Sequence, residues 1–110
     1  MLEFIRIARA RNVPVGLVLI PHLSPLKDGN YPFLYLHKRV LGWCEREGIV
    51  CVDLLPVMEP YLNDGTKYMQ LWVNRFDSHM GPFGNELAAQ RLMEVFGPSW
   101  ATATDSNRAR

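Results

Sequence analysis

The stretch VPVGLVLI, residues 13–20, is an almost continuous apolar run that ends at Pro21. It is short and rich in Val, Leu and Ile, and its apolar residues do not alternate with polar ones. Such a run is typical of a strand buried on both faces of a parallel sheet. A second short run of this kind, IVCV at residues 49–52, is followed directly by Asp53. The two runs predict two neighbouring parallel strands.

Helical patterns lie before, between and after the two predicted strands. Apolar side chains recur at helical spacing in three stretches, which are residues 2–11, 33–47 and 82–96. Gly48 ends the second stretch, Pro82 suits the first turn of the third, and Gly97-Pro98 ends the third. This alternation predicts an α/β fold in which right-handed crossovers join parallel strands.

The remaining segments predict irregular structure. Residues 21–32 are rich in Pro, Gly, Asn and Asp and predict a loop. Residues 54–62 are apolar but contain prolines, which predicts a short helix or a turn, and residues 63–80 predict a loop with several aromatic side chains. The mostly small and polar residues 99–110 predict a flexible tail behind one small domain that spans residues 1–98.

Composition limits the class of protein. The 110-residue chain is 48% hydrophobic, which suits one packed domain and excludes a disordered chain. Lys and Arg total 12 against 11 Asp and Glu, so net charge gives no argument for binding nucleic acid or an anionic membrane. We expect no membrane span and no secretory signal, because no segment has the required apolar length. The cellular compartment is left open.

The two cysteines, Cys44 and Cys51, are too few for a disulfide framework. Cys44 falls in an amphipathic stretch and Cys51 in an apolar one, where a cysteine is typically a buried free thiol. A disulfide or a redox pair is the alternative. We expect two buried thiols.

The predicted strands leave the sheet incomplete. Strands of the buried type expect strand neighbours and helices on both faces, and two of them do not make such a sheet. The pattern therefore predicts the C-terminal part of a doubly wound α/β domain whose earlier strands are absent. We expect the exposed sheet edge to cause self-association of the isolated chain.

Asp77 and His79 stand one residue apart, just ahead of the third predicted helix. A neutral His can take a proton from a serine hydroxyl when an acceptor such as an Asp carboxylate holds its other nitrogen. The plainer interpretation is a solvated Asp beside a His that caps the helix. A metal site is a further alternative, but it needs a third or fourth ligand, and His22 and His37 are the only other histidines. We expect no metal and no cofactor.

The stretch DSHMGPFGNELAA, residues 77–89, resembles the last conserved block of the SGNH/GDSL hydrolase family. That block carries an Asp, a His, a Gly shortly afterwards, and then a helix with paired Ala. Upstream, VPVGLVLIP and REGIVCVDLLPVM resemble the last two strands of the family, including the Asp-Leu after the second. The resemblance extends in the same element order from about Leu2 to Phe96.

The resemblance implies the C-terminal part of a three-layer α/β/α, flavodoxin-like parallel-sheet domain. It also implies a serine esterase acting on a small-molecule ester, with His79 as general base and Asp77 as its orienting acid. Many members of the family place two residues within the pair, and here only Ser78 intervenes. Met80 and Gly81 stand where the family usually carries Pro-Asn.

The Gly-Asp-Ser nucleophile block of the family does not occur in the 110 residues. The resemblance therefore implies that the nucleophile and the oxyanion hole lie on sequence outside this chain, which alone is expected to be inactive. Ser24, in HLSPL, is expected to be an ordinary loop residue. The alternative function is a non-catalytic α/β fragment or interaction module.

Overall fold

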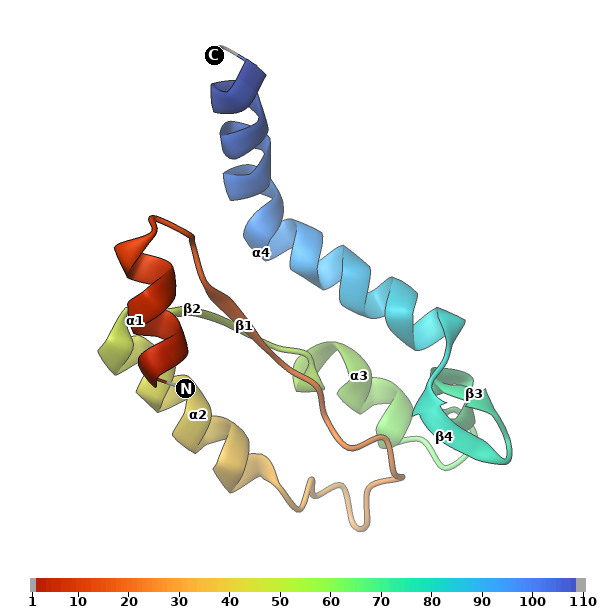
Figure 1. Ribbon diagram of the computed structural model, residues 1–110. Coiled ribbons are helices and arrows are strands. Elements are labelled where there is room, and N and C mark those ends of the chain that lie inside the picture. The colour runs from red at the N-terminus through yellow and green to blue at the C-terminus, as the bar shows by residue number, and fades with distance from the viewer. Residues whose placement is uncertain (1, 109–110) are drawn as a thin grey trace.

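The structure, a computed structural model, describes the backbone of residues 2–108 and the side chains of residues 3–99. It is a small mixed α/β unit with one parallel and one antiparallel two-stranded sheet in the described residues (Figure 1). In chain order the elements are α1 (Leu2–Ala10), β1 (Gly16–Leu19), α2 (Leu34–Glu47), β2 (Val50–Asp53), α3 (Leu55–Leu62), the 3₁₀ helix η1 (Tyr68–Leu71), β3 (Trp72–Asn74), β4 (Asp77–Met80) and α4 (Pro82–Arg108).

The two predicted buried-type strands pair in parallel, as expected. Gly16 lies opposite Val50 and Leu19 lies opposite Asp53, and the Leu54 N–H donates to the Leu19 carbonyl at 3.0 Å. Helix α2 is the crossover between them. The predictions of parallel neighbouring strands and of helices near residues 2–11 and 33–47 are confirmed.

Helices pack on both faces of the parallel pair. Cys51 lies in a cluster with Ile5 of α1 and Cys44 of α2. Its neighbour Val52 lies in a second cluster, which contains α3 residues and Ala88 of α4. Because successive side chains of a strand point to opposite faces, the two clusters lie on opposite sides of the sheet.

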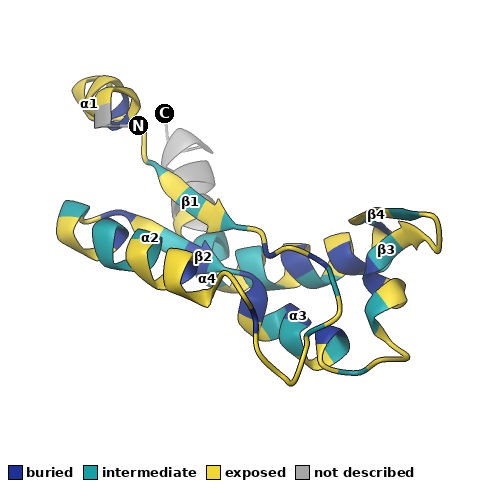
Figure 2. Cartoon of the chain, turned by 90° about the horizontal axis from the view of Figure 1, so that it is seen from below, coloured by how far each residue is buried: buried dark blue, intermediate teal, exposed yellow. Residues whose placement is uncertain are grey.

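The prediction that both strands are buried on both faces is wrong in the described residues. Val18 is 36% exposed and Val50 is 53% exposed, and residues at alternate positions of β1 are exposed (Figure 2). An apolar groove of about 370 Å³ follows this part of the sheet, lined by Pro14, Val15, Gly16, Val18, Val50, Leu92, Phe96 and Ser99. Both strands therefore have the composition of interior strands but remain partly exposed to solvent.

Residues 63–80 do not form the predicted loop. They contain η1 and an antiparallel hairpin, in which Trp72 of β3 pairs with Met80 of β4 and Asn74 pairs with Asp77. The Asn74 side chain accepts the Phe76 N–H at 2.8 Å and closes the turn. These strands are short and mostly exposed, so they carry no apolar alternation that a sequence pattern could reveal.

Helix α4 does not end at Gly97-Pro98 as predicted but continues to Arg108. Pro98 lacks the N–H that would reach the carbonyl four residues earlier, and such a residue bends a helix without always ending it. The helix changes direction in this region (Figure 1). The earlier half packs on α3 and the hairpin.

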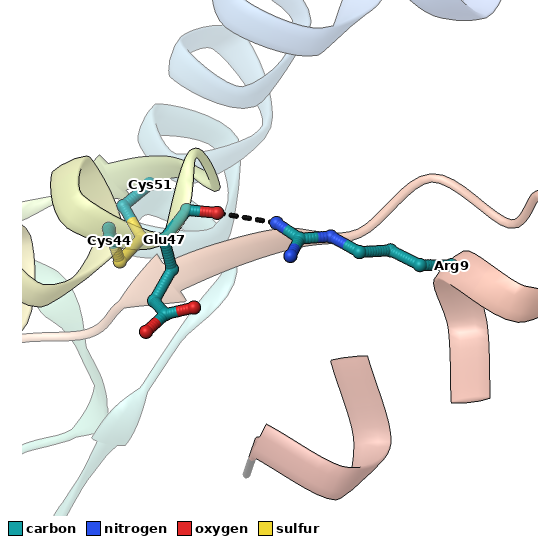
Figure 3. Close-up of a disulfide and its surroundings, with 4 residues drawn as sticks. All are labelled: Arg9, Cys44, Glu47 and Cys51. Carbon is teal, nitrogen blue, oxygen red and sulfur yellow. Dashed lines mark hydrogen bonds between the residues drawn. A yellow bond between two sulfur atoms is a disulfide. The ribbon is translucent and has the colours of Figure 1, made fainter. Parts of the chain in front are cut away.

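The two cysteines are not free thiols. Cys44 and Cys51 form a disulfide whose Cα atoms lie 6.2 Å apart (Figure 3). Gly48 ends α2 in the left-handed conformation, with φ of 67°, and turns the chain back beneath the last helical turn. The guanidinium of Arg9 also contacts the Glu47 carbonyl, so α1 is tied to the same helix end. The prediction of two buried thiols is therefore wrong: the turn at Gly48 brings two residues only seven positions apart close enough to be joined.

Candidate functional site

Strand β4 presents Asp77 and His79 on the same side of the hairpin. In a strand, residues two positions apart point the same way, so a one-residue spacing is sufficient for contact. Asp77 Oδ1 lies 2.6 Å from His79 Nδ1 and also accepts the backbone N–H of His79 at 3.1 Å. The predicted contact between the Asp77 carboxylate and His79 Nδ1 is confirmed, although it is built on a strand and not on a loop.

This contact determines the electrostatics of the pair. Hydrogen bonds from the His79 ring, and secondarily from its backbone N–H, hold the pKa of the Asp77 carboxyl below its usual range. The ionised carboxylate accepts a hydrogen bond from Nδ1–H, so the lone pair of a neutral His79 ring is on Nε2. The His79 side chain is 91% exposed and that of Asp77 is 44% exposed. A proton acceptor held in one orientation therefore stands at an open surface.

His79 borders a cavity of about 260 Å³. Its lining comes from the end of β1, the loop that follows and β4, and consists of Ile20, Pro21, His22, Leu23, Ser24, Ser78, His79 and Met80. The cavity thus lies beyond the carboxyl end of a parallel strand, where ligands bind in open α/β sheets. Four of the lining residues are apolar, and the other four are two histidines and two serines.

Ser24 is a loop residue, as expected, but it lines the same cavity as His79. Within the described residues no serine hydroxyl is hydrogen-bonded to His79, whose only ring partner is Asp77. The site therefore contains a base and its orienting acid, without a nucleophile held against the base.

The other two histidines lie in different surroundings. His22 directly follows the first predicted strand, where a structural histidine is the plainer interpretation, but it is exposed and lines the cavity, and its ring centroid lies 6.0 Å from that of Phe33. His37, expected in a charged helical stretch, is only 6% exposed. Its Nδ1 lies 2.9 Å from Asp53 and its Nε2 lies 3.2 Å from the Tyr31 hydroxyl. The only sequence signal for this network was Asp53, a carboxylate directly after a buried strand.

Metal-ligating side chains do not gather in the part of the chain that the structure describes. No three His, Cys, Asp or Glu residues are placed there so that they could hold a metal ion. Asp77 and His79 have no third ligand beside them among these residues. The helices described here include none that is long and apolar enough to cross a membrane.

Known proteins do not identify this site. Comparisons of the chain with models of protein families, with curated protein sequences and with solved structures find no match.

Proposed function

We propose that this chain supplies the Asp–His part of a serine esterase or acyl hydrolase of SGNH/GDSL type. His79 is the general base and Asp77 is the acid that orients it. The observation that carries the proposal is the 2.6 Å contact between Asp77 Oδ1 and His79 Nδ1 at the edge of a cavity. The nucleophilic serine and the oxyanion hole are proposed to lie on polypeptide outside the 110 residues.

The proposed chemistry uses the free nitrogen of His79. Nε2 takes the proton of the serine hydroxyl as its oxygen attacks the ester carbonyl, and the imidazolium then gives that proton to the departing alcohol. Water cleaves the acyl-enzyme by the same path, with Nε2 again as base. Asp77 holds the ring and stabilises the imidazolium, and no metal or cofactor is needed.

The proposed fold is the C-terminal part of a three-layer α/β/α domain, spanning residues 1–98. Two features support it: helices pack on both faces of the β1–β2 pair, and the outer edge of β1 has no strand partner among the described residues. A further parallel strand beside β1 completes such a sheet. The small cavity supports a small-molecule ester as substrate.

The test is an esterase assay on a protein in which this chain is joined to the polypeptide encoded upstream in the same frame. With an aryl acetate as substrate, His79→Ala should lower kcat by about 10⁴-fold and Asp77→Asn by somewhat less, because the ring remains but loses its fixed tautomer. Arg75→Ala, an exposed change on the same hairpin, is the matched control and should keep wild-type activity. Full activity in His79→Ala would contradict the proposal.

A fluorophosphonate probe locates the nucleophile. The 110-residue chain alone should show no labelled serine, since it holds a base without a nucleophile. Labelling of Ser24, which lines the cavity beside His79, would overturn the proposal that the nucleophile lies elsewhere.

A non-catalytic interaction module is the second candidate. It is favoured by the 91% exposure of the His79 side chain and by the open apolar edge of the β1–β2 pair. Absence of both turnover and fluorophosphonate labelling in the longer protein would select this candidate.

A further inference from the structure

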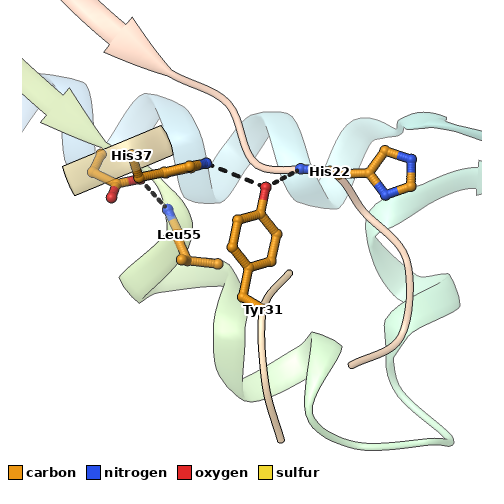
Figure 4. Close-up of polar contacts among 5 residues, drawn as sticks. His22, Tyr31, His37 and Leu55 are labelled. Carbon is orange, nitrogen blue, oxygen red and sulfur yellow. Dashed lines mark hydrogen bonds and ion pairs between the residues drawn. The ribbon is translucent and has the colours of Figure 1, made fainter. Parts of the chain in front are cut away.

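A chain of hydrogen bonds runs through the protein interior and takes no part in the proposed reaction. It links Asp53 to His37 at 2.9 Å, His37 to the Tyr31 hydroxyl at 3.2 Å, and that hydroxyl to the backbone N–H of His22 at 2.8 Å (Figure 4). His37 and Tyr31 are both buried. The four residues belong to three separate segments of the chain.

One end of this network is firmly placed. Asp53 is the last residue of β2, and its Oδ1 accepts both the His37 ring N–H and the Leu55 N–H at 3.0 Å. The carboxylate therefore joins the end of the sheet to the first turn of α3 and to α2. Its side chain is largely buried, so water competes little for these bonds.

With a neutral His37 ring, the donors and acceptors of the network fit one direction. The Asp53 carboxylate accepts, so His37 Nδ1 donates and the neutral ring has its lone pair on Nε2. The Tyr31 hydroxyl donates to that lone pair, and its oxygen accepts the His22 N–H. No buried side-chain nitrogen or oxygen in the described residues lacks a partner. A fully satisfied buried network of this kind holds its members in one arrangement.

The other end of the network reaches the cavity. Only the backbone of His22 is bound to Tyr31, and its ring projects away from Tyr31 in Figure 4. That side chain lines the cavity together with Ser24 and His79, whereas His37 and Tyr31 do not line it. The network thus determines where the backbone of one cavity wall lies relative to the sheet.

We propose that Tyr31 and His37 are positioning residues for this cavity. Through their hydrogen bonds they fix the position of the His22 backbone relative to Asp53, at the end of β2. They thereby hold in place the loop that lines the cavity together with His79. This inference rests on the proposed function for its catalytic consequence. Its structural part concerns the 110-residue chain itself.

Tyr31→Phe is the sharpest variant, because it removes the hydroxyl and keeps the ring against His37 and Phe33. In the 110-residue chain, hydrogen exchange of the His22 amide should accelerate about tenfold, since its acceptor is lost. Amides in α2 and α4 should keep their protection. Tyr35→Phe, at an exposed tyrosine without a hydrogen bond among the described residues, is the matched control and should change neither.

His37→Asn separates the two halves of the network. The Asn amide can take the place of Nδ1 and donate to Asp53, but it has no group at the place of Nε2 to accept from Tyr31. It should therefore accelerate His22 exchange by less than Tyr31→Phe does, because the Tyr31 hydroxyl is still present to accept the His22 N–H, and the double variant should exchange no faster than Tyr31→Phe alone. Additive effects, or faster exchange throughout the chain, would show general destabilisation and overturn the inference.

Kinetics of the longer protein complete the test. If the wall orients substrate, Tyr31→Phe should raise KM about 3- to 10-fold with little change in kcat, and Tyr35→Phe should alter neither constant. An unchanged KM overturns the positioning role. A wild-type protein without turnover overturns the proposed function and, with it, the catalytic role. Even then, hydrogen exchange of the His22 amide tests whether the network fixes the position of this loop.

Discussion

Gly81 lies so close to the backbone of Trp72 that a Cβ built on it would stand 2.3 Å from the Trp72 carbonyl oxygen. The Gly81 N–H donates to the Leu71 carbonyl at 2.8 Å, which brings the two chain segments together. Gly81 directly follows β4 and precedes the first residue of α4. The contact therefore holds the junction between α4 and β4, the strand that carries Asp77 and His79, against the start of β3.

Gly81→Ala should destabilise the protein, because the methyl group meets backbone atoms that no change of rotamer can move. We expect the free energy of unfolding to fall by about 1–3 kcal/mol, the range found for overpacked sites. Urea unfolding followed by circular dichroism measures the change. Gly65→Ala is the control: a Cβ there would meet nothing within 4 Å, and stability should change by less than about 0.5 kcal/mol. Equal stability of the two variants would contradict the close contact.

The Cys44–Cys51 disulfide should form in the chain purified under oxidising conditions. Thiol titration after denaturation should then find no free cysteine, and two after reduction. Replacing Cys51 by Ser should lower the free energy of unfolding by about 2–3 kcal/mol, the loop-entropy estimate for so short a loop. Reduced wild-type protein is the control and should lose a similar amount. Two titratable thiols before reduction would show that the disulfide has not formed and would support the prediction of two free thiols.

Titration of Asp77 tests the Asp–His contact directly. Its pKa should lie below the usual aspartate range in the wild type, because the His79 ring and backbone N–H donate to it, and should rise in His79→Ala, which removes the ring. The stabilising effect of a lowered carboxyl pKa is present above the pKa of the unfolded chain and is lost as pH falls through the folded one. The carboxyl carbon signal in NMR follows this titration. An unchanged Asp77 pKa in the variant would argue against the ring contact.

The isolated chain should self-associate through the outer edge of β1. The carbonyl of Leu19 points to β2, so the backbone groups of Gly16, Val18 and Ile20 point to the open edge. Two copies related by a two-fold axis can pair antiparallel there, with Val18 opposite Val18. Sedimentation analysis should find a concentration-dependent dimer or larger species.

Val18→Lys should weaken this association, because a charge on an edge strand opposes pairing with another strand. Val73→Lys makes the same change at an exposed position of β3 and should leave the association unchanged. A wild-type chain that stays monomeric at every concentration would contradict association through the edge of β1.

The parallel strand pair and the helices that pack on it could be predicted from the sequence alone. The signals for these elements are local: continuous apolar runs indicate the strands, helical spacing of apolar residues indicates the helices, and Gly48 marks a helix end. The contact between Asp77 and His79 was predicted from the family resemblance of residues 77–89, but the sequence placed the pair in a loop and not on the strand that positions it.

The way in which distant segments meet could not be predicted from the sequence. The hairpin carrying Asp77 is held by the close approach of Gly81 to Trp72, which no periodicity encodes. The burial of His37 depends on Asp53 lying beside it, at the end of another element. Such contacts join residues that are separate in sequence, and their free energy comes from packing and hydrogen bonding that exist only after the chain has folded.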